Sequence, residues 1–212
     1  SPKPEGEPMP DFDALPFPIG TTAGCSSATD HAELEGREFT IPDLDYSSST
    51  GNWRSGYTGP DSRIVKIVRN KSGVALLPCL AVQYRSGYNG RHVIGYTTTN
   101  PSKPAGFVDE YLNATNGAPA DDLFYIAVSG LVSYKVSATA SEAVLVAGEY
   151  LTTVTAAAST TSTTAGRLTA AVTTGATGPL AAQLLNVIGI NVSAATTADT
   201  NTNKLMRITN RL

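Results

Sequence analysis

The sequence predicts an all-β fold, either a barrel or a sandwich, preceded by an extended arm. Three observations lead to this prediction. Short runs of β-branched and aromatic residues recur from residue 61 onward, separated by Gly, Pro and Asn. Eight of the 13 prolines lie in the first 60 residues, where their fixed φ and missing N–H oppose helices and central strands. Only 16% of the 212 residues are charged, so the polarity comes mainly from Thr, Ser, Asn and Gly.

The first 60 residues differ from the rest in charge. They hold ten acidic and three basic side chains, a net charge of −7, whereas the remainder holds eight acidic and twelve basic, a net charge of +4. The apolar residues of this segment are too scattered to form a core of their own. We therefore predict an extended arm that becomes ordered on a partner, with its boundary near Gly59-Pro60.

The strands of the second part are predicted from composition and alternation. Residues 63–69 also fit a short helix by spacing, but their β-branched composition favours a strand. A turn over Gly87–Gly90 predicts a hairpin, and Gly130 is expected to break a long apolar run into two strands. The expected strands are 63–69, 77–84, 91–96, 123–129, 131–136, 150–154, 167–172, 184–193 and 205–211.

Two short helices are expected, over residues 108–113 and 141–146. Residues 152–177 are almost entirely Thr, Ala, Ser, Gly and Val, with Arg167 as their one charge. This stretch fits a pair of edge strands, for which Thr is well suited. Edge strands are the favoured interpretation; the alternative is a surface that packs against a neighbouring subunit and avoids long charged side chains.

Few residues indicate catalysis or metal binding. His31 lies near Glu33 and Glu35 without the spacing of a metal site, so we expect a solvated cluster. His92 has no carboxylate beside it in the sequence, and we expect a cross-strand polar contact. Cys79 lies in an apolar stretch and is expected to be a small buried hydrophobic residue.

Two adjacent pairs of carboxylates, Asp109-Glu110 and Asp121-Asp122, resemble the pairs that acid–base catalysis requires, although turns and caps use the same residues. No phosphate-binding, dinucleotide-binding or nucleophile-elbow motif is present. We therefore predict no enzymatic activity, no cofactor and no metal. The net charge of −3 argues against nucleic-acid binding, and no apolar stretch is long enough to cross a membrane.

Several short blocks follow one another along residues 63–212. They are Arg69-Asn70-Lys71-Ser72-Gly73 with Leu76-Leu77-Pro78; Gly106-Phe107-Val108-Asp109-Glu110; Asp122-Leu123-Phe124-Tyr125 running to Val128-Ser129-Gly130; Ala147-Gly148-Glu149-Tyr150-Leu151; and Val187-Ile188-Gly189-Ile190. Their order and spacing resemble the head decoration (capsid cement) proteins of tailed bacteriophages. The chain departs from the family pattern at Cys79, where a Gly is expected after Pro78, and at Leu131, where a Pro is common.

The resemblance implies a small antiparallel β-barrel or β-tulip-like domain over residues 61–212, with residues 1–60 as the arm. It implies a structural virion protein on the outer surface of the capsid. Such a protein binds the major capsid protein as a homotrimer or a dimer and stabilises the contacts between capsid subunits. It needs no cofactor, no direct contact with nucleic acid and no membrane.

On this hypothesis the arm lies over adjacent capsid subunits and adds backbone pairing at a sheet edge. Its apolar side chains then fill pockets of the partner, because such anchors dominate the energy of an interface. The predicted anchors are Phe12, Leu15, Phe17, Ile19, Trp53 and Tyr57.

Two other functions stay open at this point. Tyr84, Tyr88 and Tyr96 around the predicted hairpin could form a stacking platform of a carbohydrate-binding or adhesive β-domain of a virion. The second is a hydrolase that depends on Asp121 or Asp122.

Overall fold

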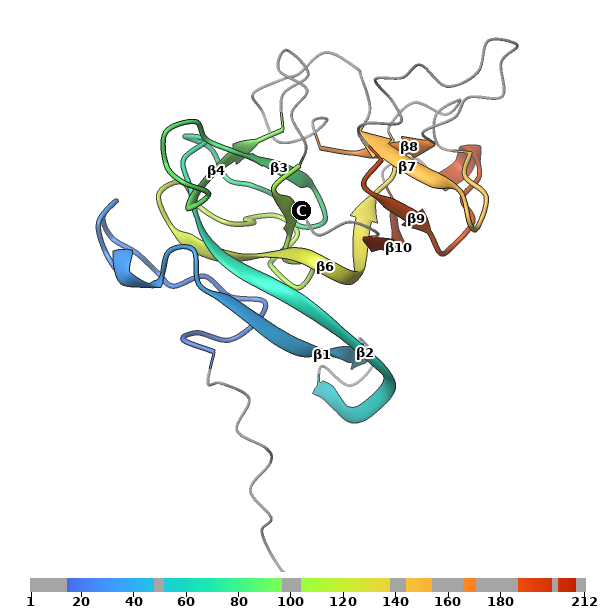
Figure 1. Ribbon diagram of the computed structural model, residues 1–212, viewed down its shortest axis with the longest axis horizontal. Helices are drawn as coiled ribbons and strands as arrows, with labels where there is room; N and C mark the ends of the chain where they lie inside the picture. The colour runs from blue at the N-terminus through green and yellow to red at the C-terminus, as the bar shows by residue number, and fades with distance from the viewer. Residues whose placement is uncertain are drawn as a thin grey trace, which may run out of the picture.

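The computed structural model of the chain is built from strands (Figure 1). It describes residues 15–47, 52–96, 104–137, 144–153, 166–170, 187–199 and 202–208, and within these the side chains of all but residues 42–61 and 169–170. The strands are β1 (Glu38–Ser47), β2 (Asn52–Asn70), β3 (Ala81–Tyr84), β4 (His92–Gly95), β5 (Gly106–Val108), β6 (Leu123–Lys135), β7 (Tyr150–Thr153), β8 (Leu168–Ala170), β9 (Gly189–Asn191) and β10 (Asn203–Ile208).

The all-β class is confirmed. Among the described residues the only helical elements are two single 3-10 turns, η1 (Ala32–Leu34) and η3 (Thr197–Asp199). The helix expected over 108–113 is wrong, because Val108 ends β5 and a turn follows it. Of the helix expected over 141–146, residues 141–143 lie outside the described residues, and Leu145 forms an antiparallel bridge to Ala195.

The strands are hydrogen-bonded in the order β1-β2-β4-β3-β5-β6-β10-β9-β7-β8, with a further pairing of β2 with β6. The predicted antiparallel arrangement holds for the named strands with one exception, since β2 and β4 pair in parallel through Arg69 and Asn70. The predicted strand over 63–69 lies within β2, and the predicted turn over Gly87–Gly90 joins β3 to β4.

Strand β6 joins two parts of the molecule: the first part contains β1 to β5, and the C-terminal part contains β7 to β10. Its first half pairs with β2 and β5, and its second half pairs with β10. Figure 1 shows it running from the side of β3 and β4 to the group formed by β7, β8, β9 and β10. The expected break at Gly130 is wrong: this residue has a φ of +96° and lies inside one continuous strand. Gly130 therefore redirects the strand between two sets of partners.

The core follows this division. One cluster lies within the first part and includes Val82, Val93 and Phe124. Another fills the C-terminal part, with Tyr134, Leu151, Leu168 and Met206 each 0% exposed. Phe107 and Ala81 of the first part belong to this second cluster, so the two parts share one apolar interior.

The C-terminal strands curl back on themselves. Strand β8 stands at the far end of the strand order, yet Val136 at the end of β6 forms a parallel bridge to Leu168 of β8. The Ser137 N–H also donates to the Leu168 carbonyl at 3.0 Å. This contact gives the short strand β8 a partner on both sides.

The predicted domain boundary after residue 60 lies inside β2. This strand runs without a break from Asn52 to Asn70, and β1 pairs with it in an antiparallel hairpin from Glu38 opposite Lys66 to Ser47 opposite Asn52. The end of the predicted arm is thus the first hairpin of the sheet. The same strand contributes Val65 and Ile67 to the core, so the pairing ties both segments together.

No helix in the described part of the chain is long and apolar enough to cross a membrane.

Candidate functional site

Residues 15–37, here called the strap, lie against the sheet formed by β2 and β6. Phe17 is 9% exposed, and its ring centroid lies 4.5 Å from that of Tyr125 on β6. The Tyr125 hydroxyl donates to the Phe17 carbonyl at 2.9 Å, and burial raises the pKa of Tyr125 to about 12. Leu15 and Ile19 are half-buried beside them. Of the three predicted anchors in this segment, Phe17 is thus buried within the chain, while Leu15 and Ile19 keep part of their surface exposed, and their role at a partner stays a prediction.

The strap is also fixed by buried carboxylates. Asp109, 7% exposed, accepts the Gly20 N–H at 2.7 Å and the Tyr111 N–H at 3.1 Å. Asp122, 4% exposed, accepts the N–H of Cys25 at 2.9 Å. Backbone pairing adds to this, since the Ala23 N–H donates to the Leu123 carbonyl at 3.0 Å. Each carboxylate thus satisfies a backbone N–H of the strap that would otherwise lose its hydrogen-bond partner when the strap packs against the sheet.

The other carboxylate of each adjacent pair, Glu110 and Asp121, binds a cation. Glu110 pairs with Arg63, and Asp121 pairs with Lys71. The sequence left open whether these two pairs perform acid–base chemistry. In the structure all four carboxylates are engaged in local contacts, and burial raises the pKa of Asp109 to about 6.

A buried ion-pair cluster holds the C-terminal end of the strap. The Arg69 side chain is 0% exposed, and its Nε donates to Glu35 Oε1 at 2.5 Å. Its remaining donors reach the carbonyls of Ser27, Asp30 and Asp121 at 3.3, 2.5 and 2.7 Å. Burial lowers the pKa of Arg69, but the hydrogen bond and charge of Glu35, together with a smaller contribution from Cys25, raise it above its ordinary value, so the guanidinium stays charged.

Glu35 also contacts His92, whose Nε2 lies 3.1 Å from Glu35 Oε2. The expectation of a cross-strand contact for His92 is thus wrong in its partner, which comes from the strap. Sequence reasoning missed this because 57 residues separate the two side chains. The exposed contact between His31 and Glu33 at 3.6 Å matches the expected solvated cluster, whereas Glu35 lies outside it.

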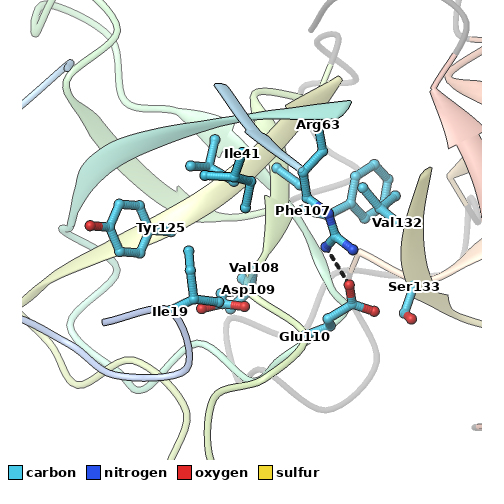
Figure 2. A pocket seen from close by; sticks show the side chains of 12 residues that line it. Ile19, Ile41, Arg63, Phe107, Val108, Asp109, Glu110, Tyr125, Val132 and Ser133 are labelled. Carbon is cyan, nitrogen blue, oxygen red and sulfur yellow. Dashed lines mark hydrogen bonds and ion pairs between the residues drawn. The ribbon is translucent and has the colours of Figure 1, made fainter. Parts of the chain in front are cut away.

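A small pocket lies where the strap, β6 and β5 meet (Figure 2). Ile19, Ile41 and Tyr125 lie on one side of the view, and Arg63 reaches Glu110 beside Ser133 on the other. Asp109 lies between these groups. Its carboxylate already accepts the N–H groups of Gly20 and Tyr111. The pocket is therefore lined by apolar side chains on one side and by the ion pair of Arg63 and Glu110 on the other.

The other predicted anchors lie on the hairpin or beyond the described residues. Trp53 is register-paired with Tyr46, and Tyr57 with Leu44. These positions fall in the half of the β1–β2 hairpin that extends away from the rest of the molecule in Figure 1. Phe12 lies outside the described residues.

The two cysteines are free thiols. Cys79 is buried as expected, and burial raises its pKa to about 12. It is not part of a strand, however, but has a φ of +64°, in the region that favours glycine. In the described part of the chain no group of three His, Cys, Asp or Glu side chains is arranged to hold a metal ion.

The three tyrosines of the expected stacking platform are separated by burial. Tyr96 is 2% exposed, and its hydroxyl accepts from Thr153 at 3.1 Å. Tyr84 is half-buried, and Lys66 Nζ donates to its hydroxyl at 3.2 Å. Tyr88 is 41% exposed and stacks on His92 with ring centroids 4.2 Å apart. The tyrosines therefore do not form one exposed surface.

Comparisons of the chain with protein-family models, with curated proteins and with solved structures gave no match in any of the three.

Proposed function

We propose that the protein is a structural virion component that binds the outer surface of a phage head and stabilises contacts between major capsid protein subunits. The observation that carries this proposal is the β1–β2 hairpin. It extends from the body of the molecule (Figure 1), and β1 lies at one end of the strand order. Among the described residues β1 forms a ladder with β2 alone, so its other edge has the geometry for pairing with a partner strand.

The resemblance to head decoration proteins supports the proposal, because its sequence blocks lie on strands and turns of the fold. The quoted blocks coincide with β5, with β6 up to its bend, with the turn before β7, and with β9. Cys79 departs from the family pattern, yet its φ of +64° is one that the expected glycine would adopt readily. The departure therefore keeps the backbone conformation that the pattern implies.

We also propose that the C-terminal strands form the small barrel of such a domain. The bridge from Val136 to Leu168 and the shared cluster around Tyr134 and Met206 support this closure. In this proposal the strap and the hairpin have different roles. The strap side chains pack against the body of the molecule, and the hairpin contacts the capsid.

Capsid binding can be measured with purified heads stripped of the protein. The double variant Trp53→Ala, Tyr57→Ala should lower the affinity for these heads at least about tenfold, because aromatic anchors contribute most of an interface energy. Tyr88→Ala is the matched control, since it removes an exposed aromatic side chain from the β3–β4 turn and should leave the affinity unchanged.

Failure of the wild-type chain to sediment with heads would contradict the function itself. Equal affinities of the wild type and the hairpin double variant would contradict the role of the hairpin. A loss of glycan binding in Tyr88→Ala, with no binding to heads, would favour the carbohydrate-binding alternative instead.

A further inference from the structure

An exposed aromatic ring lies in the turn between β3 and β4. Among the large apolar side chains of the described residues that are exposed, Tyr88 alone belongs to the first part of the molecule, and it is 41% exposed. Its ring stacks on that of His92, with centroids 4.2 Å apart and an angle of 25° between the planes. The Arg85 guanidinium lies 5.1 Å from the centroid of the same ring. Two neighbours thus hold the ring in place, yet a large share of its surface stays open to a ligand.

The groups that support this ring are buried. The His92 side chain is 12% exposed, and its Nε2 lies 3.1 Å from Oε2 of Glu35, which is 7% exposed. Glu35 in turn pairs with the fully buried Arg69. The turn itself is closed by a hydrogen bond from the Arg91 N–H to the Tyr88 carbonyl at 3.0 Å. Tyr88 is therefore presented in a fixed position, which reduces the entropy that its side chain loses when a ligand binds.

The two arginines of this turn carry charge that is open to a ligand. Arg85 and Arg91 are both exposed, and among the described residues neither has a carboxylate oxygen within 4.0 Å. The pKa of Asp121 is lowered by Lys71 and, more weakly, by Arg69 and Arg85, but its carboxylate binds Lys71. Other cations of the described chain do pair with carboxylates, namely Arg63, Lys66, Arg69, Lys71 and Lys204. The turn between β3 and β4 is thus a place where a further anion finds a partner.

These side chains together indicate the chemistry of the ligand. We call them the turn patch; it consists of Arg85, Tyr88, Asn89 and Arg91, all exposed. A tyrosine ring packs its apolar surface against the C–H groups of a sugar ring, and its hydroxyl bonds to water or to a sugar hydroxyl. An arginine fork binds a carboxylate through two parallel hydrogen bonds. A sugar that carries a carboxylate satisfies both kinds of side chain.

The size of the turn patch argues against two other classes of ligand. A stable protein partner usually engages about 20–30 residues on each side, far more than one turn offers. Nucleic-acid binding takes most of its affinity from many phosphate contacts, and this turn supplies only the cations Arg85 and Arg91. A polysaccharide needs neither, because successive sugars can lie across an exposed turn and many copies of the protein add avidity.

We propose that the turn patch binds an acidic polysaccharide, a chain of sugar rings that carry carboxylates. One sugar ring packs on the exposed part of Tyr88, and its carboxylate pairs with Arg85. Arg91 follows on the adjacent strand and meets the carboxylate of a neighbouring sugar, while the Asn89 amide bonds to sugar hydroxyls. This binding is a property of the chain alone and does not require a capsid.

The place of the turn patch fits a role on the outside of a particle. Strand β2 pairs with β1 in the hairpin and with β4 at Arg69 and Asn70, so the hairpin and the turn patch lie toward opposite ends of one strand. Figure 1 shows the outer end of the hairpin at one side of the molecule and β3 and β4 at the other. Where the hairpin holds a capsid, the turn patch faces the surroundings. Only this placement rests on the proposed function.

Isothermal titration of the full chain tests the proposal with defined polymers. Alginate and polygalacturonate, both chains of uronic acids, are compared with uncharged dextran and with poly-L-glutamate, which carries carboxylates without sugar rings. At least one of the uronic acid polymers should bind at least about tenfold more tightly than both controls. Absence of binding to both uronic acid polymers would overturn the proposal. Equal affinity for poly-L-glutamate would also overturn it and would point to an acidic protein segment as the ligand.

Variants locate the binding on the molecule. Tyr88→Ala and Arg85→Ala should each lower the affinity for the bound polymer about tenfold. Tyr150→Ala and Lys204→Ala are the matched controls: Tyr150 is 51% exposed on β7, and Lys204 pairs with Asp199 on the C-terminal part. Both controls should bind as the wild type does, and a thermal denaturation of each variant verifies that it is folded. Equal affinities of Tyr88→Ala and Tyr150→Ala would contradict the assignment to the turn patch.

The two proposals of the article fail independently in these measurements. Binding to stripped heads requires the hairpin, so Tyr88→Ala should keep it while losing the polysaccharide. A chain that binds heads but no uronic acid polymer would overturn the turn patch alone, because head binding does not involve Tyr88 or Arg85. The bound polymer should also be released at about 0.5 M salt, since salt screens the contacts of exposed arginines.

Discussion

Glu35 shows how one residue can fix a long segment. Its side chain is 7% exposed and bridges the fully buried Arg69 and His92, so it joins the strap to two strands. A buried charge that loses its partner keeps its full desolvation cost. Arg69 would still have its three carbonyl acceptors after loss of Glu35, but it would lose the one carboxylate to which its guanidinium is shown to donate directly.

We therefore expect Glu35→Gln to lower the free energy of unfolding by roughly 3 kcal/mol. Urea denaturation followed by circular dichroism measures this change. Glu33→Gln is the matched control: the Glu33 side chain is 65% exposed, and its contact with His31 is long, so the change should stay within about 0.5 kcal/mol. Similar losses in both variants would show that Glu35 has no special role.

Asp109 gives the molecule a measurable pH dependence. Burial raises its pKa to about 6, although the N–H groups of Gly20 and Tyr111 lower it in part. The unfolded chain has the ordinary value of about 3.9. The folded state thus binds a proton more readily, and the cost of burying the charge is present above pH 6 and is relieved as the pH falls through 6.

Between pH 7 and pH 5 the wild type should gain about 1 kcal/mol of stability relative to Asp109→Asn. The variant keeps an oxygen that can accept the Gly20 N–H but has no charge to titrate. Urea titrations of both proteins across this range give the difference, in which the effects of other titrating groups cancel. Parallel stability curves for the two proteins would rule out a raised pKa at Asp109.

At the scale of elements, Gly130 decides how β6 serves two sets of strands. A Cβ at this position would lie 2.8 Å from the Arg63 Cα, and the φ of +96° is unfavourable for any other residue. Gly148 has a similar φ of +88° but nothing within 4 Å of such a Cβ. The two glycines thus separate backbone strain from steric contact with β2.

Gly148→Ala should cost about 1–2 kcal/mol, the ordinary penalty of a left-handed conformation. Gly130→Ala should cost at least about 2 kcal/mol more, because the backbone of β2 has to shift. Thermal denaturation of both variants measures the difference. If they lose the same stability, β2 adapts freely, and Gly130 matters only through its φ.

The same elements show what the sequence could predict. Residues 63–69 and 150–153 are strands for local reasons, since β-branched and aromatic side chains favour strands whatever lies beside them. The strap could not be predicted, because Phe17 is buried against Tyr125 and other residues that are distant in sequence. The sequence indicates either catalysis or turns and caps for the pairs Asp109-Glu110 and Asp121-Asp122. The backbone partners of Asp109 and Asp122, Gly20 and Cys25, carry no sequence signal.

At the scale of the whole molecule, the two parts are joined by more than β6. The Ala81 N–H donates to the Gly166 carbonyl at 2.8 Å, and the Lys135 N–H donates to the Cys79 carbonyl at 3.1 Å. The core cluster around Met206 includes Phe107 from the first part. Loss of the C-terminal packing should therefore expose apolar surface in the first part as well, which makes separate unfolding of either part unfavourable.

We expect Met206→Ala to lower the stability of the entire described fold by about 2–5 kcal/mol, because the side chain is fully buried and leaves a cavity. Amide signals in a temperature series of NMR spectra report on each strand separately. Those of β2 and β10 should disappear at one common midpoint in the wild type, and both midpoints should fall together in Met206→Ala. Val146→Ala, at a position 64% exposed, is the control that should leave them nearly unchanged. Melting of β10 with β2 still intact would show that the C-terminal strands fold as a separate unit attached through Gly130.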